Sequence, residues 1–174
     1  SYHQKTKVRD LALLTLLLGT GIRVSECVGL NIADIDFKNG GIRIYRKGGK
    51  EVTVYFGTEV EDALLDYLEE RDRIIPEKGH EDALFLSLQR RRMAVRSVEN
   101  LVKKYARIVS PLKPITPHKL RSTYGTNLYR ETGDIYLVAD VLGHSDVNTT
   151  KRHYAALEDE RRRSARNKVR LREK

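Results

Sequence analysis

The stretch "TKVRDLALLTLLLGTG", residues 6–21, holds the longest apolar run of the chain. Its leucines would cover nearly every face of a helix, which is typical of a helix at the centre of a core. Gly19 and Gly21 follow this run and are predicted to end the helix, because glycine readily adopts the left-handed conformation found at helix C-termini. The next residues, "RVSECVGLN", predict a short second helix over 23–31.

A β-hairpin is predicted in "GGIRIYRKGGKEVTVYFG", residues 40–57. β-Branched and aromatic residues alternate in two runs, and the "KGGK" between them is a strong turn signal. Beyond the hairpin, "TEVEDALLDYLEERDRII" predicts an acidic amphipathic helix that stops at Pro76. "ALFLSL", residues 83–88, is compatible with a short strand or a turn, and "MAVRSVENLVKKYARIV" (93–109) predicts a helix with a basic face.

The last third of the chain predicts helices only. Thr116 is the expected N-cap, and Pro117 the first residue, of a helix through "TPHKLRSTYGTNLYRET". Further helices are predicted over 134–143, closed by Gly143, over 147–157, capped by Ser145 or Asp146, and over 158–174, which is mostly polar. The predicted fold class is therefore mainly α with a small antiparallel β-sheet, that is, α+β.

The composition excludes several classes of protein. The 174 residues suffice for one domain with a core, and 40% apolar with 33% charged residues fit neither a disordered chain nor a membrane protein. The opening "SYHQKTKVRD" is too polar for a signal peptide, and the single Cys27 excludes an internal disulfide. We therefore expect a cytoplasmic protein without membrane contact.

The positive charge is concentrated in one part of the chain. The net charge is +9, yet residues 58–82 hold ten acidic and three basic residues, whereas 88–122 hold ten Lys or Arg and one acid. A merely solvated surface usually mixes both signs, so this segregation predicts a face that binds nucleic-acid phosphates. The candidate DNA contacts are Lys50, at the hairpin tip, and Arg91, Arg92, Arg96 and Lys119.

Several polar residues could bind a phosphate, and each also has a plain structural explanation. His118 and Arg121 share a face in the first turn of a predicted helix, where backbone N–H groups attract anions. Arg23 opens the second helix and can donate to another phosphate oxygen, or only pair with Glu26. The two lysines of "KGGK" flank the hairpin tip, where exposed lysines are common.

His144, Tyr154 and Cys27 are the remaining candidates. His144 lies in a loop between two predicted helices, and Tyr154 lies in the second of them, where a buried core tyrosine is the simplest interpretation. Cys27 lies in an apolar stretch and is more typical of a core residue than of a nucleophile. The histidines show no metal-ligand spacing with cysteines or carboxylates, and no P-loop motif is present. We therefore expect neither a metal nor a nucleotide cofactor.

In chain order, "GTGIRVSECVGLNIADID", "YRKGGKE", "TPHKLRSTYGT" and "LGHSDVNTT…Y" resemble the tyrosine recombinase, or phage-integrase, family. The resemblance covers nearly the whole chain as the catalytic domain of that family and implies its fold. It implies six catalytic residues, which are Arg23, Lys47, His118, Arg121, His144 and the nucleophile Tyr154. Lys47, rather than Lys50, is selected by a gapless count from Arg23.

The resemblance also implies a reaction on double-stranded DNA. The tyrosine would attack a phosphodiester and give a 3′-phosphotyrosine and a free 5′-hydroxyl, with energy conserved in the covalent bond. The two arginines and His144 would stabilise charge on the phosphate, His118 would take the tyrosine proton, and Lys47 would protonate the leaving oxygen. A type IB topoisomerase and a DNA-binding protein without chemistry remain the alternatives.

The spacing before the tyrosine departs from the family pattern. The usual gap from the "LGH" histidine is nine residues, and here Tyr154 follows His144 by ten, with His153 at the ninth position. One extra residue turns a helical side chain by about 100°. We therefore expect a local irregularity at Tyr154.

Members of the family usually carry an N-terminal domain that clamps the other side of DNA. The chain begins at the first catalytic helix, so residues 1–174 are interpreted as a catalytic domain without the core-binding domain. It is then either a fragment of a larger protein or an unusually minimal member. Segment 158–174 is expected to bind a neighbouring subunit in a homotetramer on DNA, or DNA itself. A chromosome-dimer resolvase, a phage integrase and a transposon integrase all fit these residues.

Overall fold

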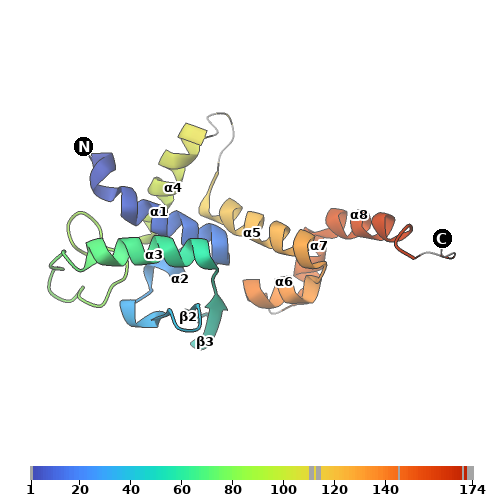
Figure 1. The fold of residues 1–174 in the computed structure, drawn as a ribbon, viewed down its shortest axis with the longest axis horizontal. Coiled ribbons are helices and arrows are strands. Elements are labelled where there is room, and N and C mark those ends of the chain that lie inside the picture. The colour runs from blue at the N-terminus through green and yellow to red at the C-terminus, as the bar shows by residue number, and fades with distance from the viewer. Residues whose placement is uncertain (1, 110–111, 113–114, 145, 170, 172–174) are drawn as a thin grey trace. The chain divides into compact units, whose positions relative to one another are not determined.

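The computed structural model describes residues 2–109, 112, 115–144, 146–169 and 171. These residues form a mainly helical chain with one three-stranded antiparallel sheet, which confirms the predicted fold class (Figure 1). The elements are α1 (Tyr2–Thr20), α2 (Val24–Val28), the 3-10 helix η1 (Ile32–Asp34), β1 (Ile35–Asp36), β2 (Gly41–Arg46), β3 (Lys50–Tyr55), α3 (Thr58–Arg71), α4 (Val95–Val109), α5 (Pro117–Thr132), α6 (Ile135–Leu142), α7 (Val147–His153) and α8 (Ala155–Ala165). The chain divides into two compact units, residues 1–124 and 125–174, so that α5 begins in the first and ends in the second.

The core of the first unit lies around α1, which packs along α3 (Figure 1). The apolar run of α1 is buried on one face only, because Leu11 and Leu18 remain 57% and 46% exposed. The helix is central to the core, as predicted, although one side of its apolar run faces solvent. The buried hydrophobic residues of α1 are Ala12, Leu13, Leu16 and Leu17.

Only one of the two glycines after the apolar run ends α1. Gly21 has φ of +69°, the left-handed conformation expected at a helix C-terminus. Gly19 is still inside the helix, and a Cβ there would lie 2.5 Å from Cγ2 of Val60 on α3. Gly19 is thus needed for the close approach of two helices, and its prediction as a helix stop is wrong.

The predicted hairpin is present, and it belongs to a sheet in the order β1-β2-β3. Arg46 pairs with Lys50 across the last register position, which leaves Lys47, Gly48 and Gly49 as the turn. Both glycines have positive φ, +85° and +75°, as a tight hairpin turn requires. The two-residue strand β1 pairs with the edge of β2 opposite β3, and it was not predicted.

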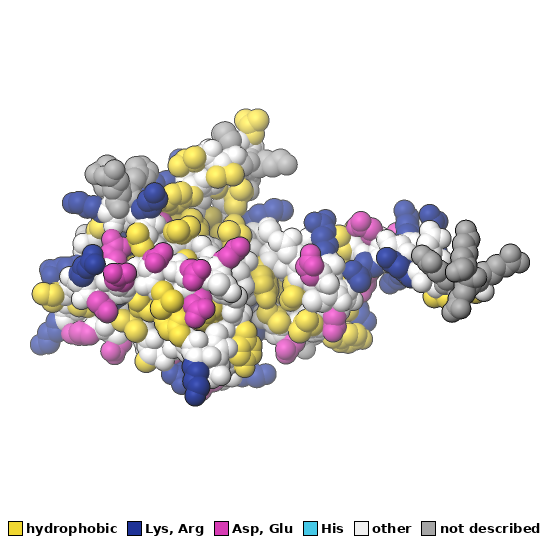
Figure 2. All heavy atoms as spheres, viewed as in Figure 1, with side chains coloured by type: hydrophobic (Ala, Val, Ile, Leu, Met, Phe, Trp, Pro, Cys, Tyr) yellow, Lys and Arg dark blue, Asp and Glu magenta, His cyan; other side chains and the backbone are white. Residues whose placement is uncertain are grey.

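Helix α3 ends at Arg71, earlier than the predicted stop at Pro76. The buried Arg71 side chain donates to the carbonyls of Glu81 and Ala83, so the chain turns back along the helix. Segment 83–88, predicted as strand or turn, makes single antiparallel bridges to other segments rather than a strand. Acidic side chains gather over α3 on the face seen in Figure 2.

The helix ends in the last third largely follow the sequence. Thr116 caps α5 by accepting from the Lys119 N–H at 3.2 Å, and Gly143 closes α6 with φ of +73°. Asp146 caps α7, whereas Ser145 lies outside the described residues. The predicted polar helix 158–174 is wrong at both ends, because α8 runs over 155–165. No helix in the described ranges is both long and apolar enough to cross a membrane.

Candidate active site

Arg121 is held against the turn that precedes Arg23. Its side chain is buried, and Nη1 donates to the carbonyl of Gly21, two residues before Arg23. The ring of Tyr124 fills the place that a Cβ of Gly21 would occupy. The start of α5 is therefore anchored on the α1–α2 turn, and the two predicted catalytic arginines are brought to neighbouring positions in the first unit.

A buried carboxylate links Arg23 to Arg46, the last residue of β2 before the hairpin turn. Glu26 Oε1 accepts the Arg23 backbone N–H at 2.7 Å, and Oε2 lies 3.5 Å from Arg23 Nη1 and 3.3 Å from Arg46 Nε. The Glu26 and Arg46 side chains are 4% and 8% exposed, whereas that of Arg23 is 44% exposed. Glu26 thus pairs with two cations, whose net charge stays positive, and leaves the Arg23 guanidinium reachable by a ligand.

The two other candidates of the first unit are exposed. Lys47 follows Arg46 directly at the hairpin tip, so the Glu26–Arg46 pair also ties its backbone to α2. His118 lies one turn before Arg121 on α5 and is exposed beside it. The first unit therefore carries Arg23, Lys47, His118 and Arg121. Gly21 connects the helix of His118 and Arg121 to the turn before Arg23, and Glu26 connects Arg23 to the hairpin strand that precedes Lys47.

The second unit carries His144 and Tyr154, and Thr150 contacts both. The Thr150 side chain is fully buried, and its Oγ1 lies 2.5 Å from Nδ1 of His144. The Thr150 carbonyl accepts the backbone N–H of Tyr154 at 3.0 Å. Two predicted catalytic residues that are ten positions apart are therefore tied to one threonine.

Tyr154 sits at a break between two helices. Its backbone, with φ of −107° and ψ of 19°, ends α7 and precedes α8, which confirms the predicted local irregularity. The side chain is 3% exposed, and its hydroxyl packs where Gly125 of α5 lacks a Cβ. The rings of Tyr129 and His153 lie 6.2 and 4.7 Å from its ring, centroid to centroid. The Tyr154 side chain is thus buried within the second unit, whereas His153 is exposed.

Arg92 differs from the other predicted DNA contacts. Its Nη1 donates to the carbonyls of Val28 and Leu30, both at 2.9 Å, and its Nη2 to the Asn31 side chain at 2.5 Å. A guanidinium with these internal partners has fewer donors left for a phosphate, and Arg92 as a DNA contact stays a prediction. The remaining candidates, which are Lys50, Arg91, Arg96 and Lys119, are all exposed.

Cys27 is a core residue. It is fully buried, and burial raises the pKa of its thiol from 9.0 to about 12. A thiol acts as a nucleophile through its thiolate, which is scarce at neutral pH when the pKa is this high. This agrees with the sequence interpretation of Cys27 as part of the core.

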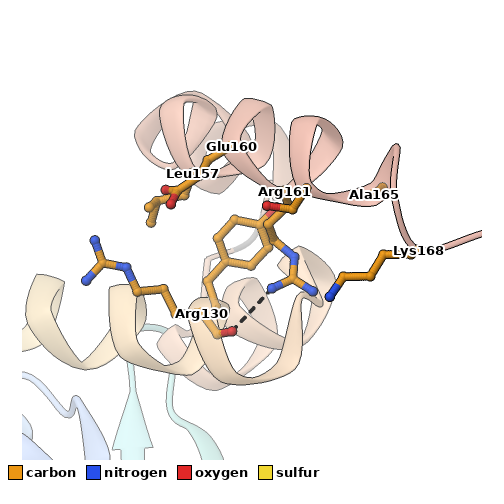
Figure 3. A pocket seen from close by; sticks show the side chains of 8 residues that line it. Arg130, Leu157, Glu160, Arg161, Ala165 and Lys168 are labelled. Atoms are coloured by element: carbon orange, nitrogen blue, oxygen red, sulfur yellow. Dashed lines mark hydrogen bonds between the residues drawn. The ribbon is translucent and has the colours of Figure 1, made fainter.

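A pocket of about 410 Å³ lies in the second unit between α5 and α8 (Figure 3). Arg161 reaches from α8 to donate to the Arg130 carbonyl at 3.2 Å, and its guanidinium lies 5.7 Å from the centre of the Tyr129 ring. Because Tyr129 also faces Tyr154, Arg161 anchors α8 beside the residues that enclose the tyrosine. Lys168 lines the same pocket.

Three contributors to the site were not predicted, namely Arg46, Thr150 and Gly125. Thr149 and Thr150 are alike in the sequence, and only the phase of α7 decides that Thr150 is buried while Thr149 is exposed. Gly125 did carry a signal, because glycine inside a helix costs roughly 1 kcal/mol relative to alanine and therefore indicates a close contact.

Comparison with known proteins decides the family. The chain matches the phage integrase family over residues 1–161. It belongs to this family. A tyrosine recombinase XerD of Oceanobacillus iheyensis is 38% identical over 148 residues, which is 84% of this chain and 50% of the relative. The chain thus spans about half the length of this curated relative.

Solved structures of recombinases share the fold. The crystal structure of the XerA recombinase superposes with a TM-score of 0.81 at 31% identity, over 99% of this chain and 62% of that one. The XerH site-specific recombinase, bound to its difH substrate in a pre-cleavage complex, gives 0.75 at 27% identity, over 86% and 43% of the two chains. The fold is therefore that of the tyrosine recombinase catalytic domain.

Proposed function

We propose that the chain is the catalytic part of a site-specific DNA recombinase that cleaves and rejoins strands through a 3′-phosphotyrosine. The observation that carries the proposal is the docking of Arg121 on Gly21, beside Arg23, with Glu26 fixing the start of α2. Two fixed guanidinium groups at one turn suit the non-bridging oxygens of a phosphate. The name of the XerD relative and the DNA-bound XerH structure support the same function.

The chemistry assigns one task to each residue. The Tyr154 hydroxyl oxygen attacks phosphorus and its proton passes to His118, while the bond from phosphorus to the 5′-oxygen breaks. Lys47 gives a proton to that oxygen, and the DNA 3′ end stays esterified to the tyrosine. Attack by the 5′-hydroxyl of another strand reverses the steps and reseals the backbone.

The charge that develops on the phosphate oxygens needs fixed donors. Arg23 and Arg121 supply two of them, and His144 supplies a third hydrogen bond. The exposed Lys50, Arg91, Arg96 and Lys119 hold the DNA backbone without reading its sequence. The protein acts on double-stranded DNA as a homotetramer, with the segment beyond α8 as the subunit contact.

Replacing the nucleophile tests the reaction directly. The substrates are DNA duplexes selected for binding from a random pool, each nicked at a different position. Cleavage near the nick releases a short fragment of the cut strand, so the strand cannot be rejoined and the covalent complex accumulates. Tyr154→Phe should bind these duplexes with nearly unchanged affinity and form no adduct that survives denaturant, because only the attacking oxygen is removed. The adduct is measured on a denaturing gel.

His153→Ala is the matched control, because His153 occupies the ninth position after His144 and is exposed. It should retain the adduct. An adduct formed by Tyr154→Phe would show that the nucleophile is a different residue. Relaxation of supercoiled DNA with no strand-exchange product would instead assign the protein to the topoisomerase class.

A further inference from the structure

Thr150 is placed differently from its neighbour in the sequence. Both lie on α7, but Thr150 has no exposed surface, whereas Thr149 is exposed and its hydroxyl accepts from the Arg152 side chain at 3.5 Å. A buried hydroxyl must be hydrogen-bonded to be tolerated, since desolvating it without a partner costs free energy. The partner in reach is Nδ1 of His144, at 2.5 Å from Oγ1.

The backbone on both sides of the His144–Thr150 contact is held by hydrogen bonds. Gly143 ends α6 in the left-handed conformation, and the His144 N–H donates to the Ala139 carbonyl at 2.9 Å. Asp146 caps α7 by accepting from the Asn148 N–H at 2.9 Å, which fixes the start of the helix that carries Thr150. The contact between His144 and Thr150 therefore joins two well-anchored segments of the second unit.

A neutral imidazole carries its proton on only one nitrogen, and the hydrogen bond at the other nitrogen selects which one. If the Thr150 hydroxyl donates to Nδ1, the proton of His144 is fixed on Nε2. If the hydroxyl accepts from Nδ1, then Nε2 has a lone pair and cannot donate. Only the first arrangement lets a neutral His144 donate a hydrogen bond through Nε2 to an anion.

We propose that the Thr150 hydroxyl donates to Nδ1 of His144 and so holds the neutral ring in the Nε2–H form, as a positioning residue for the phosphate-binding histidine. The proposal rests on the proposed function for the role of His144, but the state of the ring can be measured without DNA. Because the Thr150 carbonyl also binds the Tyr154 N–H, the same residue sets the register between the histidine and the nucleophile.

The first test measures the ring itself by nitrogen NMR of the histidine side chains, with His144→Gln used to assign its signals. The unmutated protein should show His144 with a proton on Nε2 and a bare Nδ1. Thr150→Val, which keeps the shape and removes the hydroxyl, should give a mixture of both forms. Thr150→Ser should restore the single form, and Thr149→Val should change nothing. A proton on Nδ1 in the unmutated protein, or an unchanged spectrum in Thr150→Val, overturns the proposal.

The second test measures adduct formation on the nicked duplexes. Thr150→Val should slow cleavage by a factor on the order of 10 to 10², less than the loss of a whole transition-state donor, with DNA affinity unchanged. Thr150→Ser should recover most of the rate. An unchanged rate in a Thr150→Val protein whose ring has lost its single form overturns the positioning role. If the unmutated protein forms no adduct at all, the proposed function fails, while the NMR result still decides the hydrogen bond.

Discussion

At the scale of single residues, the surroundings decide what a charged side chain can do. Arg91 and Arg92 are adjacent in a basic run, yet one is exposed and the other donates to two backbone carbonyls and an asparagine. The motif residues Arg23 and Arg121 were predictable because their chemistry is tied to a fixed pattern. The roles of Arg92 and Thr150 were not, because they depend on groups that are distant in the sequence or on helix phase.

Arg92→Ala and Arg91→Ala should therefore fail in different ways. Arg92→Ala should lower the free energy of unfolding by about 1–3 kcal/mol, since it leaves two carbonyls without their donor. Arg91→Ala should leave stability unchanged and weaken DNA binding, with the slope of log affinity against log salt reduced by about 0.9. Urea unfolding and a salt titration of DNA binding measure the two effects. A reduced salt slope in Arg92→Ala, at unchanged stability, would reverse the assignment.

Lys47 should be the general acid, and Lys50 only a DNA contact. Lys47→Ala should cleave normal DNA slower by a factor on the order of 10² to 10⁴, because the leaving alkoxide lacks its proton. A substrate with sulfur at the bridging 5′ position expels a thiolate, whose thiol has a pKa of roughly 8.5, and needs no acid. Cleavage of this substrate by Lys47→Ala should approach the unmutated rate.

Lys50→Ala is the matched control, because Lys50 lies across the hairpin turn from Lys47 and is equally exposed. It should bind DNA more weakly, with the greatest loss at low salt, and show no selective gain on the sulfur substrate. Sulfur rescue of Lys50→Ala but not of Lys47→Ala would exchange the two roles. Rescue of neither would assign the proton to another donor.

At the scale of elements, glycines allow the closest contacts of the helices with their neighbours. Gly19 admits Val60 of α3, Gly21 admits the Tyr124 ring of α5, and Gly125 admits the Tyr154 hydroxyl. Helix existence followed from apolar periodicity, but these contacts depend on how helices cross, which periodicity does not encode. The end of α3 was predicted too late for the same reason. Its amphipathic sequence pattern continues past Arg71, but the helix ends there because the buried Arg71 side chain binds the Ala83 carbonyl. Strand β1 was too short to give a pattern.

Gly125→Ala should release Tyr154 from its enclosed position. The added methyl would overlap the hydroxyl, so the ring must move or the helices separate, at a cost of about 1–3 kcal/mol of stability. Tyr154 should then be modified by tetranitromethane faster than in the unmutated protein, as measured by peptide mapping. Gly57→Ala serves as the control because no atom lies within 4 Å of its added Cβ. Equal protection of Tyr154 in both variants would contradict the contact.

At the scale of the whole molecule, the candidate residues divide between two units. Arg23, Lys47, His118 and Arg121 belong to the first, and His144 and Tyr154 to the second, with α5 continuous through both. All six were proposed from the resemblance to the family, whose motifs follow one another along the chain. The division into units was not predictable, because no linker-like composition marks it.

The end of the chain carries charge and exposed apolar groups beyond α8. Val169 and Leu171 are 76% and 96% exposed, and the basic residues around them give this end a positive charge that suits an anion or an acidic partner. Within α8 itself, Arg161 is bound to the Arg130 carbonyl and stacked on Tyr129. A cut inside α8 would therefore disturb the surroundings of Tyr154, whereas a cut after Ala165 leaves these contacts in place.

Deletion of residues 166–174 should separate cleavage from recombination. Adduct formation on nicked duplexes should stay close to that of the full chain, because Arg161 and the packing of Tyr129 against Tyr154 are retained. Strand exchange between two duplexes should fall strongly, because it also needs the contact between subunits. Arg161→Ala is the matched control and should reduce both activities, since it loosens α8 beside the nucleophile. Equal loss of cleavage and exchange in the deletion would mean that the segment serves DNA binding, and a deletion that keeps full exchange would show that the subunit contact lies elsewhere.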